Sequence, residues 1–259
     1  MAVMDEFKDE RDSIKNAPFS KKLSYFWYYN KWKVIIGVVV AIVIFFTIRG
    51  YIYKKDDVLY IAMINITPTL DNIDNKVYSE ICDPFLEENG YDLKHKEIRW
   101  AADYLMNVNN GQTLSDSDKL SIFVATGSID FFYGSGKWID TYAYRDVLAP
   151  VTWYMSEEEI AEYSDYLYYI DGAVLERYEK AQDEQNYEYS EELPDPLKPE
   201  EMVNPIPIGI ILDSCRPLQE NYDCLDEEPG VMVASAVMNS KNQEVTKEYF
   251  KFLLRDNMQ

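Results

Sequence analysis

The sequence predicts an α/β protein in which one N-terminal transmembrane helix precedes a mixed-sheet α/β domain. Three observations support this fold class. Residues 34–48 form an unbroken apolar run without a charged residue. After residue 57, short apolar runs typical of buried strands alternate with stretches whose apolar residues recur at helical spacing. The net charge of −21 is concentrated after the apolar run, because residues 1–33 contain seven basic and five acidic residues.

The apolar run is predicted to be the centre of a transmembrane helix over residues 26–53. The run alone is short for a bilayer, which needs about 20 residues. Aromatic residues flank it on both sides, as in the interfacial belts of membrane helices: Phe26, Trp27, Tyr28, Tyr29 and Trp32 before it, Tyr51 and Tyr53 after it. At about 1.5 Å per residue, residues 32–52 give about 31 Å of helix. We therefore expect residues 32–52 to contact the lipid bilayer.

Two other interpretations of this run are weaker. A buried core helix can be equally apolar, but it has no need of aromatic and basic residues at both ends. A cleaved signal peptide should end in a small-x-small pattern, whereas this chain continues with residues 49–55, RGYIYKK. The 33 residues before the run also form a long leader for a signal peptide. The sequence thus favours an uncleaved anchor.

Basic residues predict the orientation of the helix. Within about 20 residues of the span, five lysines lie before it and three basic residues lie after it: Lys15, Lys21, Lys22, Lys31 and Lys33, then Arg49, Lys54 and Lys55. This excess favours a cytoplasmic N-terminus, with residues 1–25 as a cytoplasmic tail of a cell-membrane protein. Residues 57–259 would then form an extracytoplasmic domain. A surface this acidic repels nucleic acid, which excludes nucleic acid as a partner.

The outer domain is predicted from alternating strand and helix patterns. Strands are expected at residues 58–66, 97–106, 129–133, 166–170, 206–212 and 231–237. Helices are expected at residues 75–89, 115–125, 137–144 and 244–254, and a Ser-Glu-Glu-Glu capping box at residues 156–159 opens another. Residues 182–205 are acidic and contain four prolines, so they are predicted to be a long surface loop. Alternation of this kind is typical of an α/β domain with a mixed sheet.

From about Leu114 onward, the order of elements resembles part of a type 2 extracellular solute-binding protein. Four segments carry the resemblance: residues 119–127 (KLSIFVATG), 128–134 (SIDFFYG), 144–150 (YRDVLAP) and 206–213 (IPIGIILD). The resemblance implies a domain that corresponds to one lobe, or to a reduced two-lobe form, of such a protein. It also implies that the domain captures a ligand or partner, an expectation that rests on analogy of fold.

The candidate ligand site is built on the turn Gly134-Ser135-Gly136-Lys137. Backbone N–H groups exposed where a helix begins can hold an anion. The stretch is not a phosphate-binding loop, because Trp138 stands where that loop has Ser or Thr. A plain turn with two flexible glycines is the alternative. With the resemblance, the turn predicts a ligand site formed by Asn65, Thr67, Asp130, Gly134, Ser135, Lys137, Trp138, Asp213 and Ser214.

Cysteine and histidine usage argues against metal sites and against catalysis. Three cysteines without a CxxC pair and a single histidine, His95, lack the usual zinc-site spacing, and we expect no metal or other cofactor. Cys215 and Cys224 are close enough in sequence to form a disulfide, or they are two separate thiols with at least partial burial. One histidine offers no partner for triad chemistry, and no carboxylate pair stands out, so we do not expect an enzyme.

These observations predict a membrane-anchored extracytoplasmic binding module for a small ligand or a protein partner, without enzymatic activity. The alternative is a structural or assembly subunit of a membrane complex that uses the same scaffold. The alternative requires a filled or absent cleft and an exposed apolar or tyrosine patch.

Overall fold

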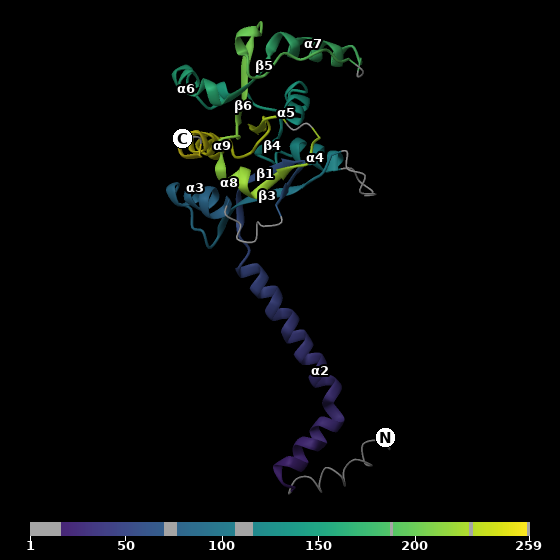
Figure 1. The fold of residues 1–259 in the computed structure, drawn as a ribbon. Helices are drawn as coiled ribbons and strands as arrows, with labels where there is room; N and C mark the ends of the chain where they lie inside the picture. The colour runs from purple at the N-terminus through teal and green to yellow at the C-terminus, as the bar shows by residue number, and fades with distance from the viewer. Residues whose placement is uncertain (1–16, 70–76, 107–115, 187–188, 228–229, 258–259) are drawn as a thin grey trace. The chain divides into compact units, whose positions relative to one another are not determined.

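The computed structural model describes residues 17–69, 77–106, 116–186, 189–227 and 230–257. The chain separates into two compact units, Met1–Lys54 and Lys55–Gln259. Figure 1 shows the ribbon of both units.

The described part of the first unit is dominated by one long helix, α2 (Phe19–Ile52). It begins directly after Pro18, whose carbonyl accepts hydrogen bonds from the N–H groups of Lys21 and Lys22, and thus starts earlier than the predicted residue 26. Its 34 residues span about 51 Å at about 1.5 Å per residue, and none of them is buried. Among the described residues, α2 is the single helix that is long and apolar enough to cross a membrane.

The second unit is a mixed α/β domain around a six-stranded sheet of order β3-β1-β4-β8-β6-β5. The strands are β1 (Asp56–Ile64), β3 (Lys96–Tyr104), β4 (Phe131–Ser135), β5 (Leu167–Asp171), β6 (Pro205–Ile211) and β8 (Met232–Ala236). Strand β1 is parallel to β3 and β4, whereas β8 is antiparallel to β4 and β6, and β5 is antiparallel to β6. A second, two-stranded antiparallel sheet pairs β2 (Ile66–Pro68) with β7 (Tyr222–Cys224). The predicted mixed-sheet α/β class is therefore confirmed.

Helices and helical turns connect the strands. The α-helices are α3 (Asp83–Glu88), α4 (Asp116–Ala125), α5 (Gly136–Ala143), α6 (Glu157–Glu162), α7 (Gly172–Asp183), α8 (Arg216–Asn221) and α9 (Gln243–Asn257). A π-helical turn, η1 (Tyr78–Cys82), precedes α3, and 3-10 turns form η2 (Val151–Trp153), η3 (Ser164–Tyr166) and η4 (Pro199–Glu201). The predicted capping box is present, because the Glu159 N–H donates to Ser156 Oγ and the Ser156 N–H donates to Glu159 Oε2.

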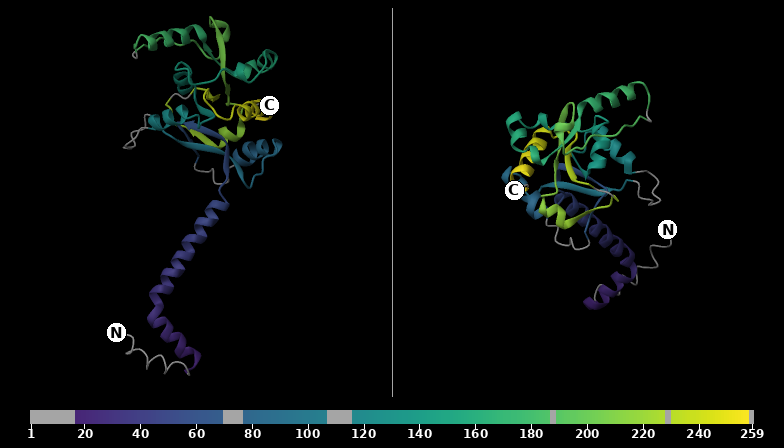
Figure 2. Two further views of the ribbon diagram at one scale, coloured as in Figure 1. Left: turned by 180° about the vertical axis from the view of Figure 1, so that it is seen from behind. Right: turned by 45° about the horizontal axis from the view of Figure 1, so that its top comes forward.

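The sheet is buried on both faces because its strands alternate their side chains between two hydrophobic clusters. In β1, Ile61 and Met63 point to one cluster, and Ala62 and Ile64 point to the other. Helices α3 and α9 cover the first face, whereas α4, α5 and α7 contribute to the second. Figures 1 and 2 show α3 and α9 on one side of the sheet and α4 and α5 on the opposite side. The result is a three-layer α/β/α domain.

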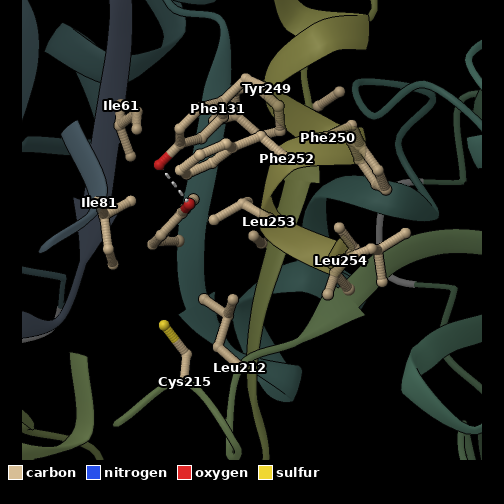
Figure 3. Packing of buried hydrophobic residues seen from close by; sticks show 14 of the residues in the cluster. Ile61, Ile81, Phe131, Leu212, Cys215, Tyr249, Phe250, Phe252, Leu253 and Leu254 are labelled. Atoms are coloured by element: carbon tan, nitrogen blue, oxygen red, sulfur yellow. Dashed lines mark hydrogen bonds between the residues drawn. The ribbon is translucent and has the colours of Figure 1, made fainter. Parts of the chain in front are cut away.

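Aromatic rings dominate the face under α9 (Figure 3). Tyr249 meets Phe131 edge-on at a ring-centroid distance of 5.2 Å and Phe85 at 5.0 Å. Its hydroxyl lies 3.1 Å from that of Tyr133, so two buried phenols satisfy each other. Such pairs add stability beyond their buried area, which explains why much of the tyrosine content lies inside the fold.

Several elements were not predicted, among them α7, α8 and β7. Helix α7 occupies residues to which no helix had been assigned, although its apolar residues Val174, Tyr178 and Ala181 follow helical spacing. Its N-cap is Asp171, which accepts a hydrogen bond of 2.9 Å from the Ala173 N–H. The predicted loop at residues 182–205 also contains the end of α7, and α8 and β7 lie between the last two strands of the main sheet in chain order.

Candidate functional site

The connections that follow β1 and β4 run to opposite sides of the sheet, so the carboxyl ends of these two neighbouring strands form a topological switch point. From β1 the chain passes to β3 on one side, and from β4 it passes toward β5, β6 and β8 on the other. Open α/β sheets bind ligands in the crevice outside the carboxyl ends of the strands at such a switch point. Asn65 directly follows β1, and Ser135 is the last residue of β4. Two of the predicted site residues are thus brought together here.

A carboxylate from a distant part of the chain occupies this point. Asp226 Oδ1 accepts a hydrogen bond of 2.7 Å from Asn65 Nδ2 and one of 3.2 Å from Trp138 Nε1. Asp226 Oδ2 accepts one of 2.6 Å from Ser135 Oγ and a weaker contact of 3.6 Å from Cys224 Sγ. Three predicted residues therefore converge on one carboxylate. We refer to Asn65, Ser135, Trp138 and Asp226 as the switch-point cluster.

Hydrogen bonding controls the charge of Asp226. Partial burial raises the pKa of its carboxyl group. The hydrogen bonds from Ser135, Asn65 and Trp138 together lower this pKa by a larger amount, so the net pKa lies below the ordinary value. Donors that favour the charged form of a carboxylate have this effect. Asp226 is therefore a carboxylate at neutral pH, and the cluster is a set of donors arranged around one anion.

Backbone geometry holds Asn65 in place. Asn65 has a φ of 52°, a left-handed conformation that asparagine tolerates better than most residues. Its Oδ1 accepts a bond of 2.6 Å from the Met106 N–H, and its carbonyl accepts one of 2.7 Å from the Leu225 N–H. Asn65 thus ties the end of β1 to the segment that carries Asp226, which fixes its amide group toward the carboxylate.

A cavity of about 240 Å³ adjoins the cluster. It is lined by Ser135, Asp213, Gln219, Tyr222, Asp223, Cys224, Gly230 and Met232. Asp213, another predicted residue, lines this cavity and accepts a bond of 3.0 Å from the Met232 N–H. Thr67 lies on β2 opposite Asp223 of β7, so the small sheet borders the same region. The cavity is smaller than the roughly 300–1,000 Å³ of drug-sized ligand pockets.

The predicted anion-binding turn is a tight junction between β4 and α5. Gly134 and Ser135 belong to β4, and the Gly136 N–H donates to the Val231 carbonyl at 3.0 Å. That N–H group is therefore already used within the fold. A Cβ at position 136 would lie 2.7 Å from the Tyr168 hydroxyl, which explains the glycine. Lys137 is exposed, with its Nζ 5.7 Å from the centroid of the Trp138 ring.

The remaining two predicted residues lie apart from the cluster. Asp130 precedes β4 at the opposite end of the strand from Ser135. It accepts bonds from the Tyr60 N–H at 2.7 Å, from Ser240 Oγ at 2.5 Å and from Asn242 Nδ2 at 3.2 Å. These contacts tie β1 and β4 to the segment before α9, which is a structural role. Ser214 is exposed at the end of the turn after β6.

The cysteines are free thiols in the structure. Cys215 is buried, and burial raises the pKa of its thiol to about 11. Cys224 is half-buried beside Asp226. Cys82 is also buried and lies 2.6 Å from the indole Nε1 of Trp100. Thiols with raised pKa values are poor nucleophiles, so Cys82 and Cys215 behave as core residues.

No sequence pattern pointed to Asp226, the residue that organises the cluster. It is one of three consecutive acidic residues at positions 226–228, and nothing in the pattern distinguishes it from its neighbours. Within the described parts of the chain, no group of three or more His, Cys, Asp or Glu side chains is arranged to hold a metal ion. Comparisons with protein-family models, with curated proteins and with solved structures return no match to this chain.

Proposed function

We propose that this protein is a membrane-anchored, non-enzymatic binding module that holds a small ligand at the switch-point cluster. Residues 32–52 would anchor it in the cell membrane, with residues 1–25 in the cytoplasm and the α/β domain outside. The apolar helix α2 supports the anchor, and the excess of lysine before the span supports the orientation.

One observation carries the binding proposal: three side-chain donors from separate elements converge on a single carboxylate at the switch point. The amide of Asn65, the hydroxyl of Ser135 and the indole N–H of Trp138 all donate to Asp226. A ligand carboxylate would find the same donors if it replaced Asp226. The adjoining cavity has room for the rest of a small molecule, such as an amino acid or a sugar acid. Asp226 would then act as an internal competitor for the site.

The binding proposal predicts that removing the competitor improves binding. The full-length protein in non-ionic detergent would be screened by thermal shift against amino acids, short peptides, sugars and sugar acids. Asp226→Ala should give a larger shift than the wild type with carboxylate ligands, because the stabilisation by a bound ligand grows with the ratio of its concentration to its dissociation constant. Glu227→Ala, an exposed neighbour, is the matched control. The absence of a shift in all three proteins would contradict ligand capture.

Topology needs a separate test. Protease added to intact cells should remove the C-terminal domain and leave an N-terminal tag protected. Loss of the tag with survival of the domain would show the opposite orientation. Recovery of the chain in the soluble fraction would contradict the anchor itself.

A second candidate function is a structural or assembly subunit of a membrane complex. Two observations favour it: Asp226 already fills the switch point, and large apolar side chains are exposed on the domain, namely Ile122, Trp153, Leu197, Val203 and Leu225. Under this proposal, Trp153→Ser or Val203→Ser should release partners that co-purify with the wild type in mild detergent. Unchanged co-purification in both variants would contradict docking through these residues.

A further inference from the structure

A larger cavity lies away from the switch point, on the face covered by α5 and α7. Its volume is about 500 Å³, within the range of small-molecule sites. It is lined by Asp140, Thr141, Tyr144, Arg145, Tyr178, Ala181, Gln182, Asn186, Tyr189 and Leu193. Helix α5, helix α7 and the segment that returns from α7 each contribute part of the wall. We refer to this cavity as the tyrosine pocket.

The aromatic wall of the tyrosine pocket consists of three rings. Tyr144 and Tyr178 stack with centroids 5.3 Å apart, and Tyr189 meets Tyr178 edge-on at 5.1 Å. Tyr189 is held by its hydroxyl, which donates to Glu191 at 2.9 Å, and Arg177 bonds the same carboxylate. The returning segment is thus fixed against α7, so the rings form a wall before any ligand arrives.

A carboxylate with a single polar partner lies in the same pocket. Asp140 Oδ1 accepts a bond of 3.0 Å from the Tyr168 hydroxyl on β5. Burial raises the pKa of Asp140 to about 6, with the Tyr168 bond as the only opposing influence and no lysine or arginine contributing from the described residues. Carboxylates withdrawn from water are normally paired with a cation or several donors. Asp140 has neither.

The charge around the pocket favours a cation. The negative charges of Asp140 and Asp171 help to raise the pKa of the Tyr144 hydroxyl. Those of Asp140 and Asp195 help to raise the pKa of the Tyr168 hydroxyl. Arg145, the one basic residue among the described residues of the lining, is exposed to solvent. Ring faces attract organic cations through their quadrupole, and a desolvated site strengthens this attraction.

We propose that the tyrosine pocket binds a small organic ammonium ion, with Asp140 as its counter-ion and the rings of Tyr144, Tyr178 and Tyr189 as its walls. Primary and quaternary amines share this chemistry. The site is separate from the switch-point cluster, so the proposal does not depend on the proposed function.

The test uses full-length protein in non-ionic detergent and isothermal titration with choline and with putrescine. The neutral isostere of choline, dimethylbutanol, has the same shape with carbon in place of nitrogen. We expect binding of at least one of the two amines and at least about tenfold weaker binding of the isostere. Equal affinity for choline and its isostere, or no binding of either amine, would overturn the proposal.

Two charge variants give opposite expected results. Asp140→Asn keeps an acceptor for Tyr168 and should weaken amine binding by about tenfold or more, because the counter-ion is lost. Arg145→Gln should strengthen amine binding, because the substitution removes a positive charge that repels the ammonium ion. The reverse pattern would mean that the pocket takes an anion and would overturn the proposal. Thermal unfolding of each variant shows whether the fold is intact, and Tyr178→Phe, which keeps the ring, should retain binding.

Discussion

Two half-buried carboxylates in this domain, Asp226 and Asp140, have pKa values that are shifted in opposite directions. Asp226 accepts bonds from three side-chain donors and its pKa is lowered, whereas Asp140 accepts one bond from Tyr168 and its pKa is raised to about 6. Both lie beside a cavity. Asp140 is buried more deeply than Asp226 and has fewer donors, so burial outweighs hydrogen bonding at Asp140, whereas hydrogen bonding outweighs burial at Asp226.

The comparison also separates two kinds of site. The switch-point cluster is satisfied by the chain itself, so an incoming ligand must displace Asp226. The tyrosine pocket leaves its carboxylate with one side-chain partner among the described residues, so an incoming cation adds a further interaction. Each prediction below changes one side of this comparison, in order of decreasing expected effect.

Removing Asp226 should have the largest effect on stability. Asp226→Ala leaves the donors of Asn65, Ser135 and Trp138 without their acceptor, which should cost about 2–3 kcal/mol in the free energy of unfolding at neutral pH. Unfolding of the full-length protein in detergent, followed by tryptophan fluorescence, measures this loss. Because the folded-state pKa is lowered, the stabilising effect of Asp226 is present above the ordinary value of 3.8 and should fade as the pH falls below it. An unchanged free energy of unfolding for Asp226→Ala at pH 7 would contradict the role of Asp226 as the organising acceptor.

Neutralising Asp140 should change the free energy of unfolding in the opposite direction and stabilise the protein. Its folded-state pKa of about 6 lies above the ordinary value of 3.8, so the folded protein binds a proton more tightly and loses stability as the pH rises between these values. Asp140→Asn should therefore stabilise the protein by about 1–2 kcal/mol at pH 7.5. At pH 3, below both pKa values, the two proteins should unfold at the same temperature. Asp183→Asn, at an exposed position of α7, is the control. A lower stability of Asp140→Asn than of the wild type at pH 7.5 would contradict this account.

Ser135 and Ser214 were both predicted as site residues, and the structure separates them. Ser135 Oγ bonds Asp226 at 2.6 Å and is buried, whereas Ser214 is exposed. Ser135→Ala should cost about 1 kcal/mol of unfolding free energy, with Asn65 and Trp138 still holding the carboxylate. Ser214→Ala should be neutral in the same unfolding assay. Equal effects of the two substitutions would show that the hydroxyl contributes nothing to the cluster.

The sequence predicted the strands well because buried strands of an α/β sheet read as short apolar runs. The expected strand at residues 206–212, for instance, corresponds to β6 (Pro205–Ile211). Helix α7 was missed although it has an N-cap and helical spacing, because the acidic stretch after it was interpreted as a loop. The cluster was predicted only in part: its donors Asn65, Ser135 and Trp138 were expected from the turn at residues 134–137 together with the resemblance. Their acceptor is 161 residues from Asn65 and 91 from Ser135, and only the folded topology unites them.

The smallest expected effect concerns the wall of the tyrosine pocket. Arg177 bonds Glu191 through Nε at 3.1 Å and through Nη2 at 2.9 Å, and Glu191 in turn holds the Tyr189 hydroxyl. Because the ion pair is exposed, Arg177→Met should leave the unfolding midpoint unchanged. It should nevertheless weaken choline binding by about twofold to threefold, because the segment that carries Tyr189 is no longer ordered in advance. Lys180→Met, one turn further along α7 and paired with Glu184 at 4.0 Å, is the matched control and should change neither quantity. If both variants bind choline as the wild type does, the ion pair of Arg177 has no part in shaping the pocket, and the rings of Tyr144 and Tyr178 hold the ligand without it.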